Sequence, residues 1–184
     1  MGDITQPLPV KLFVGVLTSI PEILPAAEER LSAFYGTIDS RSQPYPFDWT
    51  RYYDKNMGHP IYRYFLGFEN LITPGSIADI KTATNELELF FAYEWTGIPR
   101  PINLDPGYME ESKLVLASTK NFYHRIHVSR GIYAEVTLYY EKKGGTWRGF
   151  PWTFPDYAAD RYHAYFTSLR DLYRKQLQSA KNAG

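Results

Sequence analysis

The chain has 184 residues, 44% of them hydrophobic, and its 20 basic and 20 acidic side chains cancel. This length and composition favour one folded domain, which we expect over residues 1–184, with an ordered core at 9–178 and short flexible ends. A neutral chain has no overall field for a polyanion, so nucleic acid is disfavoured as a partner. The lack of cysteine excludes disulfides, thiolate catalysis and cysteine-ligated metal sites.

No localisation signal is visible in the sequence. Met1–Lys11 has no charged region followed by an apolar segment, and no stretch reaches 18 consecutive apolar residues. We therefore expect a cytoplasmic protein with no membrane partner.

The N-terminal third predicts a strand, a helix and an irregular stretch. Lys11–Leu17 is a short run of β-formers typical of a buried strand. Pro25 suits the first turn of a helix, and Gly36 ends it. Residues 37–60 hold several turn formers and predict partly strand and partly irregular structure. The apolar stripe of the helix is Leu24, Ala27, Leu31, Phe34 and Tyr35.

The middle third predicts a second strand and a second helix. Ile61–Glu69 is rich in β-formers. Thr73 as N-cap and Pro74 at the first helical position begin a helix that runs to about Trp95. Its apolar stripe is Ile77, Ile80, Thr84, Leu87 and Phe91.

A short strand, Ile102–Leu104, is expected to end in a turn at Asp105–Gly107, because each residue type there has a turn geometry. Residues 110–117 suit either helix or strand. Ser129–Gly131 is interpreted as a three-residue hairpin loop that sets Arg125 opposite Glu135. This register predicts an apolar core face, whose members are Phe122, Ile126, Val128, Ile132, Val136 and Leu138.

The last segment predicts a turn at Lys143–Gly145, a strand within Thr146–Trp152, and a final helix from Pro155 that frays after Ser179. The stripe of that helix is Tyr162, Phe166, Leu169, Tyr173 and Leu177. Together these elements predict an α+β fold, a ferredoxin-like βαββαβ sheet with an added antiparallel hairpin and a C-terminal helix.

Common mechanistic motifs are missing. The P-loop GxxxxGK[ST], a GxGxxG after a strand, HExxH, GxSxG and the EF-hand loop do not occur. P-loop nucleotide hydrolysis is therefore disfavoured, and the sequence names no cofactor.

The hairpin supplies the first candidate site. Arg125 opposite Glu135, with His127 nearby, can bind an anion and move a proton. The alternative is a solvated sheet face with an ordinary ion pair, and we weight it more heavily. His124 and His127 do not predict a metal site, because an offset of three on a strand sends them to opposite faces.

A second candidate site follows the expected strand at 102–104. Asn103 and Asp105 share a face there, and Lys113, Thr119 and Lys120 come soon after. These groups could hold a phosphorylated or carboxylated molecule, with Mg²⁺ bound through Asp105 as a further option. The alternative is that they only form turns and a cap.

Two further groups of side chains include charged residues. Lys81, Asn85 and Glu88 lie at helical spacing, which we interpret as a solvated helix face. Asp156 lies in a segment crowded with aromatic residues, of a kind more often found in cores and interfaces than in ligand sites.

Several blocks of the chain resemble an uncharacterised bacterial family, domain of unknown function 4416. They are FDWTRYY at 47–53, NLDPGY at 103–108, KLVLAST at 113–119 with Lys120, residues 124–126, residues 135–138 and WTFPDY at 152–157. The resemblance runs from Pro9 to the last helix and implies no established activity. It makes the polar members of the blocks candidates for one site: Asp48, Asn103, Asp105, Lys113, Thr119, Lys120, His124, Arg125, Glu135 and Asp156.

Three functions stay open. The first is a domain that binds or transforms an anionic small molecule, the second a homo-oligomeric interaction or scaffold protein, and the third a single-stranded RNA-binding domain. Whether the protein is an enzyme is undecided. For the first function the catalytic candidates are Glu135, Asp105 and His127. The ligand-binding candidates are Asn103, Lys113, Thr119, Lys120, Arg125 and Asp156.

Overall fold

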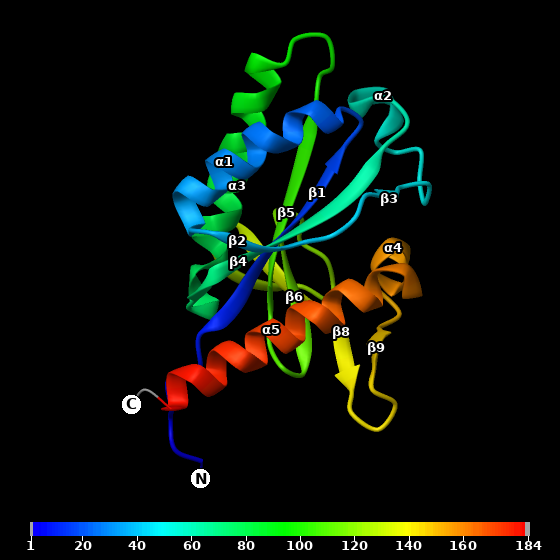
Figure 1. The fold of residues 1–184 in the computed structure, drawn as a ribbon. Coiled ribbons are helices and arrows are strands. Elements are labelled where there is room, and N and C mark those ends of the chain that lie inside the picture. The colour runs from blue at the N-terminus through cyan, green and yellow to red at the C-terminus, as the bar shows by residue number, and fades with distance from the viewer. Residues whose placement is uncertain (1, 183–184) are drawn as a thin grey trace.

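The computed structural model describes residues 2–182 and shows an α+β fold built on one antiparallel sheet (Figure 1). The main path of the sheet is β2-β4-β1-β5-β6-β8-β7, with β3 paired to β4 and β9 paired to β8. The strands are β1 (Val10–Thr18), β2 (Ile38–Arg41), β3 (Tyr45–Pro46), β4 (Tyr62–Ile72), β5 (Ile102–Met109), β6 (Lys113–Ser118), β7 (Ile126–Ser129), β8 (Ile132–Glu141) and β9 (Thr146–Gly149). The helices are α1 (Leu24–Tyr35), α2 (Asp54–Met57), α3 (Ile77–Glu94), α4 (Pro155–Ala158) and α5 (His163–Asn182), with short 3₁₀ turns at Pro21–Ile23, Pro74–Ser76 and Asp160–Tyr162.

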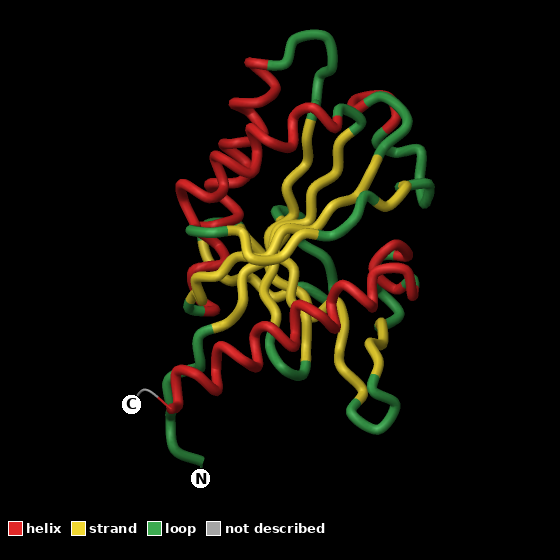
Figure 2. Tube along the Cα trace, viewed as in Figure 1, coloured by secondary structure: helices red, strands yellow, loops and turns green. Residues whose placement is uncertain are grey.

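Helices cover both faces of the central strands (Figures 1 and 2). One face of β1 packs against α1 and α3 in a cluster that includes Leu12, Leu31 and Phe91. The other packs against α5 through Phe13 and Phe166. All nine residues of β1 are buried, because a strand covered on both faces needs no alternation of polar and apolar residues.

The elements with the strongest apolar patterns are confirmed. The first strand, the first helix with its end at Gly36, the strand from Tyr62 and the long helix α3 lie where the sequence predicts them. Residues 110–117, whose sequence suits either helix or strand, include most of β6. The βαββαβ order is present in β1, α1, β2, β4, α3 and β5, whereas the ferredoxin-like name for it stays a prediction.

The turn predicted at Asp105–Gly107 is wrong, because β5 continues to Met109. Pro106 pairs with Val14 of β1, and β6 joins the other side of β5 only from Gly107 onward. Along residues 102–106 the side of β5 away from β1 therefore has no neighbouring strand. Because no strand pairs there, the N–H that proline lacks is not needed for a hydrogen bond between strands. Thr73 is the N-cap residue, with Pro74 next to it, of the 3₁₀ turn that leads into α3, as predicted, but its side chain makes no capping bond.

The predicted hairpin register is partly wrong. Ile126 pairs with Ala134 as expected, but Ser129 pairs with Ile132, so the loop has two residues and Val128 is a bulge. The predicted core face is wrong in part: Ile132 and Leu138 are buried as predicted, but Phe122, Ile126 and Val128 are exposed, while Glu135 is buried. A second bulge, at Thr137 of β8, shifts the alternation of side chains by one residue. Ile132, before the bulge, therefore packs in the α1–α3 cluster, whereas Leu138, after it, packs in the α5 cluster on the other face of the sheet.

The C-terminal segment is two short elements followed by a long helix, rather than one continuous helix. Pro155 begins α4, a 3₁₀ turn follows, and α5 starts at His163 and continues to Asn182, beyond the fraying predicted after Ser179. The predicted stripe from Tyr162 to Leu177 is nevertheless buried in full. In the first helix, Phe34 is exposed although it was expected in the apolar stripe.

Candidate functional site

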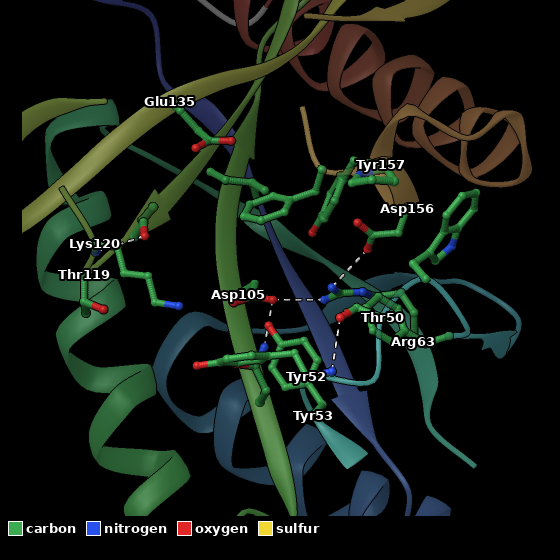
Figure 3. Close-up of a pocket in the computed structure, with 18 of the residues that line it drawn as sticks. Thr50, Tyr52, Tyr53, Arg63, Asp105, Thr119, Lys120, Glu135, Asp156 and Tyr157 are labelled. Carbon is green, nitrogen blue, oxygen red and sulfur yellow. Dashed lines mark hydrogen bonds and ion pairs between the residues drawn. The ribbon is translucent and has the colours of Figure 1, made fainter. Parts of the chain in front are cut away.

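A cleft of about 580 Å³ opens where β5 and β6 diverge (Figure 3). The two strands pair only between Gly107–Met109 and Leu114–Leu116. The residues that line the cleft come from the loop at 47–53, from β4, α3, β5 and β8, from residues 116–120, and from residues 154–157 at the start of α4, together with Arg100 before β5 and Arg125 before β7. Segments far apart in the sequence therefore meet in one concave site, which is the usual setting for a ligand.

Side chains of α3 replace the missing strand neighbour of β5. The N–H of Leu104 donates to Oε1 of Glu88 at 2.7 Å, and the ammonium of Lys81 donates to the Leu104 carbonyl at 2.8 Å. Burial raises the pKa of Glu88, although Lys81 and Arg100 oppose this. The predicted solvated face of α3 is therefore wrong at Lys81 and Glu88, whose polar groups satisfy buried backbone.

Arg63 of β4 holds two carboxylates at the wall of the cleft. Its guanidinium donates to Oδ2 of Asp105 at 3.0 Å and to Oδ2 of Asp156 at 3.2 Å, and its side chain is 4% exposed. Gly15 of β1 makes room for this group, since a Cβ there would lie 2.8 Å from the Tyr157 hydroxyl and 3.0 Å from the guanidinium. Packing and ion pairs thus fix the position of Arg63.

The two carboxyl groups on Arg63 differ in acidity. Burial raises the pKa of Asp105, but the charges of Arg63 and Lys81 outweigh it, so the pKa lies below its ordinary value. At Asp156 burial is the larger effect and the charge of Asp105 adds to it, so the pKa is raised despite Arg63. Asp105 therefore stays ionised to lower pH, while Asp156 keeps its proton to higher pH.

Arg100 and Asn103 extend this charged network along β5. Arg100 donates to Oε2 of Glu88 at 2.8 Å and also to the side-chain carbonyl of Asn103. Asn103 in turn donates to Oδ2 of Asp105 at 2.7 Å. The amide of Asn103 thus links the Arg100–Glu88 pair to the Arg63 group.

A second ionic cluster lies at the β8 side of the cleft. Arg125 donates to Oε2 of Glu135 at 2.6 Å and to the Ser118 hydroxyl at 2.8 Å. His124 contacts the same Glu135 oxygen at 3.1 Å, and its ring stacks on Trp152 with centroids 5.5 Å apart. Glu135 is thus held by two neighbours on adjacent positions of the chain.

Lys120 and Tyr52 face each other at the cleft mouth. The ammonium lies 5.4 Å from the centre of the Tyr52 ring. Within residues 2–182, Lys120 makes no ion pair with a carboxylate. In Figure 3 its side chain reaches into the cleft from the side opposite Arg63 and Asp156.

Most of the residues predicted from the sequence meet in this cleft. Those that line it are Asn103, Asp105, Thr119, Lys120, Arg125, Glu135 and Asp156. Lys113 lies elsewhere and pairs with Glu110 at 3.0 Å. His127 is exposed outside the cleft, where its ring accepts the N–H of Gly131 at 3.3 Å.

The sequence did not point to Arg63, Arg100 or the aromatic pair Tyr52–Tyr53 as site residues. Arg63 had a usable signal, since it is the one charged residue in the apolar and aromatic first part of β4, residues 62–68. Lys81 had one as well, because it lies beside the buried stripe of α3. For the residues that the structure describes, no group of three or more metal-ligating side chains is present and no helix is long and apolar enough to cross a membrane.

The family model described as Domain of unknown function (DUF4416) matches residues 8–173. The chain belongs to this family. The match confirms the resemblance seen in the sequence blocks, and most of the cleft is built from those blocks. Neither the curated proteins nor the solved structures contain a match to the chain.

Proposed function

We propose that the cleft binds a small anionic molecule that carries a phosphate or a carboxylate. The supporting observation is the charge of its lining among the described residues. Five cationic side chains, Arg63, Lys81, Arg100, Lys120 and Arg125, line it together with three carboxylates, Asp105, Glu135 and Asp156. This excess attracts an anion, and the cleft walls reduce the screening by solvent.

Two of these cations have N–H groups that are free to donate further hydrogen bonds. Lys120 makes no ion pair within residues 2–182, and Lys81 has a carbonyl as its close partner, with Asp105 4.0 Å away. An ammonium has three N–H donors, so each lysine can donate to a ligand without losing its present contacts. A buried cation with few partners is costly for a fold, which favours a functional reason for Lys81.

The same site could transform the ligand that it binds. Asp156, with its raised pKa, is the carboxyl group suited to give a proton, and Asp105, with its lowered pKa, is the group suited to stay charged. The proposal therefore includes an enzymatic form with Asp156 as acid.

Binding can be tested by thermal shift and calorimetry with inorganic phosphate, a sugar phosphate and a small dicarboxylate. A ligand that prefers the native state raises the melting temperature. We expect Lys120→Gln to weaken binding about tenfold, since a hydrogen bond to a charged group is lost. The matched control, Lys143→Gln, changes an exposed lysine in the β8–β9 loop, outside the cleft, and should leave binding unchanged.

The proposal fails if none of these anions shifts the melting temperature of the wild-type protein. It also fails if one binds but neither Lys120→Gln nor Lys81→Met changes its affinity. Raising the salt concentration should weaken true binding in this cleft, because the attraction is ionic.

A further inference from the structure

Aromatic residues gather at the mouth of the cleft. The loop at 47–53 contributes Phe47, Trp49, Tyr52 and Tyr53 to the lining. Tyr52 is 67% exposed and Trp49 is 40% exposed. Large rings left accessible beside a binding cleft offer flat apolar surface to a ligand, whereas an inorganic anion would leave that surface unused.

The Tyr52 ring is held in position before a ligand binds. It meets Tyr53 edge-on, with centroids 5.1 Å apart and planes at 89°. The backbone N–H of Tyr52 donates to the Thr50 hydroxyl at 3.1 Å. Tyr53 packs in turn on Phe47, which belongs to a buried cluster. A ring fixed in this way loses little conformational freedom when another ring stacks on it.

The loop that carries Trp49 is also fixed from outside. Arg161 donates to the Pro46 carbonyl at 2.8 Å and to Asp48 at 3.2 Å, and its guanidinium lies 4.8 Å from the centre of the Trp49 ring. The aromatic wall is therefore tied to the segment that precedes α5.

Cation and ring lie close enough for one small molecule to reach both. The Lys120 ammonium is 5.4 Å from the centre of the Tyr52 ring, so an anion bound to Lys120 places whatever it is attached to beside Tyr52. The two residues come from loops that are distant in the sequence, and both line the cleft.

We propose that the anion bound in the cleft is carried on a planar aromatic ring, with Lys120 binding the phosphate or carboxylate and Tyr52 stacking on the ring. This inference rests on the proposed function and narrows its ligand from small anions in general to aryl anions. Tyr52 thus selects the ligand, while Lys120 and its cationic neighbours hold its charge.

Calorimetry with phenyl phosphate and cyclohexyl phosphate tests this directly, because the two carry the same charged group and only one has a planar ring. We expect phenyl phosphate to bind at least about fivefold more tightly, the lower end of measured stacking effects. Tyr52→Leu should abolish that preference and Tyr52→Phe should keep it. Tyr93→Leu changes another exposed tyrosine, which lies on α3 outside the cleft; it is the matched control and should change nothing.

The outcomes separate this inference from the function on which it rests. Equal binding of both compounds, weakened by Lys120→Gln, would overturn the aryl proposal and leave the anion site standing. A preference for phenyl phosphate that survives Tyr52→Leu would overturn the role of Tyr52. Failure of every anion to bind the folded wild-type protein would remove both proposals together.

Discussion

Arg63 and Phe65 lie two residues apart on β4, yet each belongs to a different kind of interior. Phe65 is buried among rings under α5, with the centroid of Phe166 4.9 Å away. Arg63 is buried beside it among Asp105 and Asp156. Under α5 the interior consists mainly of packed uncharged rings, whereas at the cleft each buried charge needs a partner. The difference places the free-energy cost of burying charged groups at the cleft, where packing alone does not explain their presence.

The largest effect is expected in the ring cluster. Phe166→Ala removes a fully buried side chain and should lower the free energy of unfolding by about 3–5 kcal/mol, because transfer and cavity costs add. Urea denaturation measures this. Phe34→Ala, at a 66% exposed site, should stay within about 0.5 kcal/mol of wild type. Similar losses for both would contradict the burial described for α5.

In the cleft, Arg63→Met should cost about 3 kcal/mol, since it leaves two carboxylates without their cation. Adding Asp105→Asn and Asp156→Asn to Arg63→Met removes those charges and should recover a large part of the loss. A triple variant no more stable than the single one would show that Arg63 contributes by packing rather than by charge. Phe65 offers no such rescue, because its loss leaves a cavity.

A smaller effect is expected at the junction of α3 and β5. Lys81→Met keeps the aliphatic length of the side chain but removes the donor to the Leu104 carbonyl, which should cost about 1–3 kcal/mol. Chemical denaturation checks this value. Thr82→Val, which loses a hydroxyl bond to the preceding turn of the same helix, serves as control and should cost less than Lys81→Met.

The finest comparison is between the two carboxyl groups on Arg63. The lowered pKa of Asp105 adds stability that is present above the unfolded value of about 3.9 and is lost as the pH falls. The raised pKa of Asp156 acts oppositely, so stability falls as the pH rises above about 3.9. For each variant, the difference from wild type in the free energy of unfolding can be plotted against pH. The slopes of these plots should have opposite signs for Asp105→Asn and Asp156→Asn. Slopes of the same sign would contradict the assignment.

The sequence predicts those parts of the fold that depend on local pattern. Strand β1 and helix α3 follow from their apolar residues, because both faces of β1 and one stripe of α3 are buried. The continuation of β5 through Pro106 could not be predicted, since it depends on β6 diverging from β5. The inward faces of the hairpin depend likewise on the bulge at Thr137, which no local pattern marks.

In the candidate site, too, some residues follow from local sequence pattern and others depend on contacts between distant parts of the chain. Residues such as Asn103, Asp105 and Lys120 could be chosen because polar side chains cluster in short segments of the chain. Arg63 could not be joined to them, because its partner Asp156 lies 93 residues further along. The role proposed for Tyr52 could not be predicted either, because it depends on the fold bringing its loop to Lys120.

The bond from the Leu104 N–H to Glu88 has a spectroscopic consequence. Most strand amides donate to a carbonyl of the neighbouring strand, but this one donates to a carboxylate of a helix at the edge of the cleft. Its proton resonance and its exchange with solvent therefore respond to the charge and position of Glu88 rather than to sheet pairing. An isotope label at that single backbone nitrogen would give the protein an internal sensor of what enters the cleft.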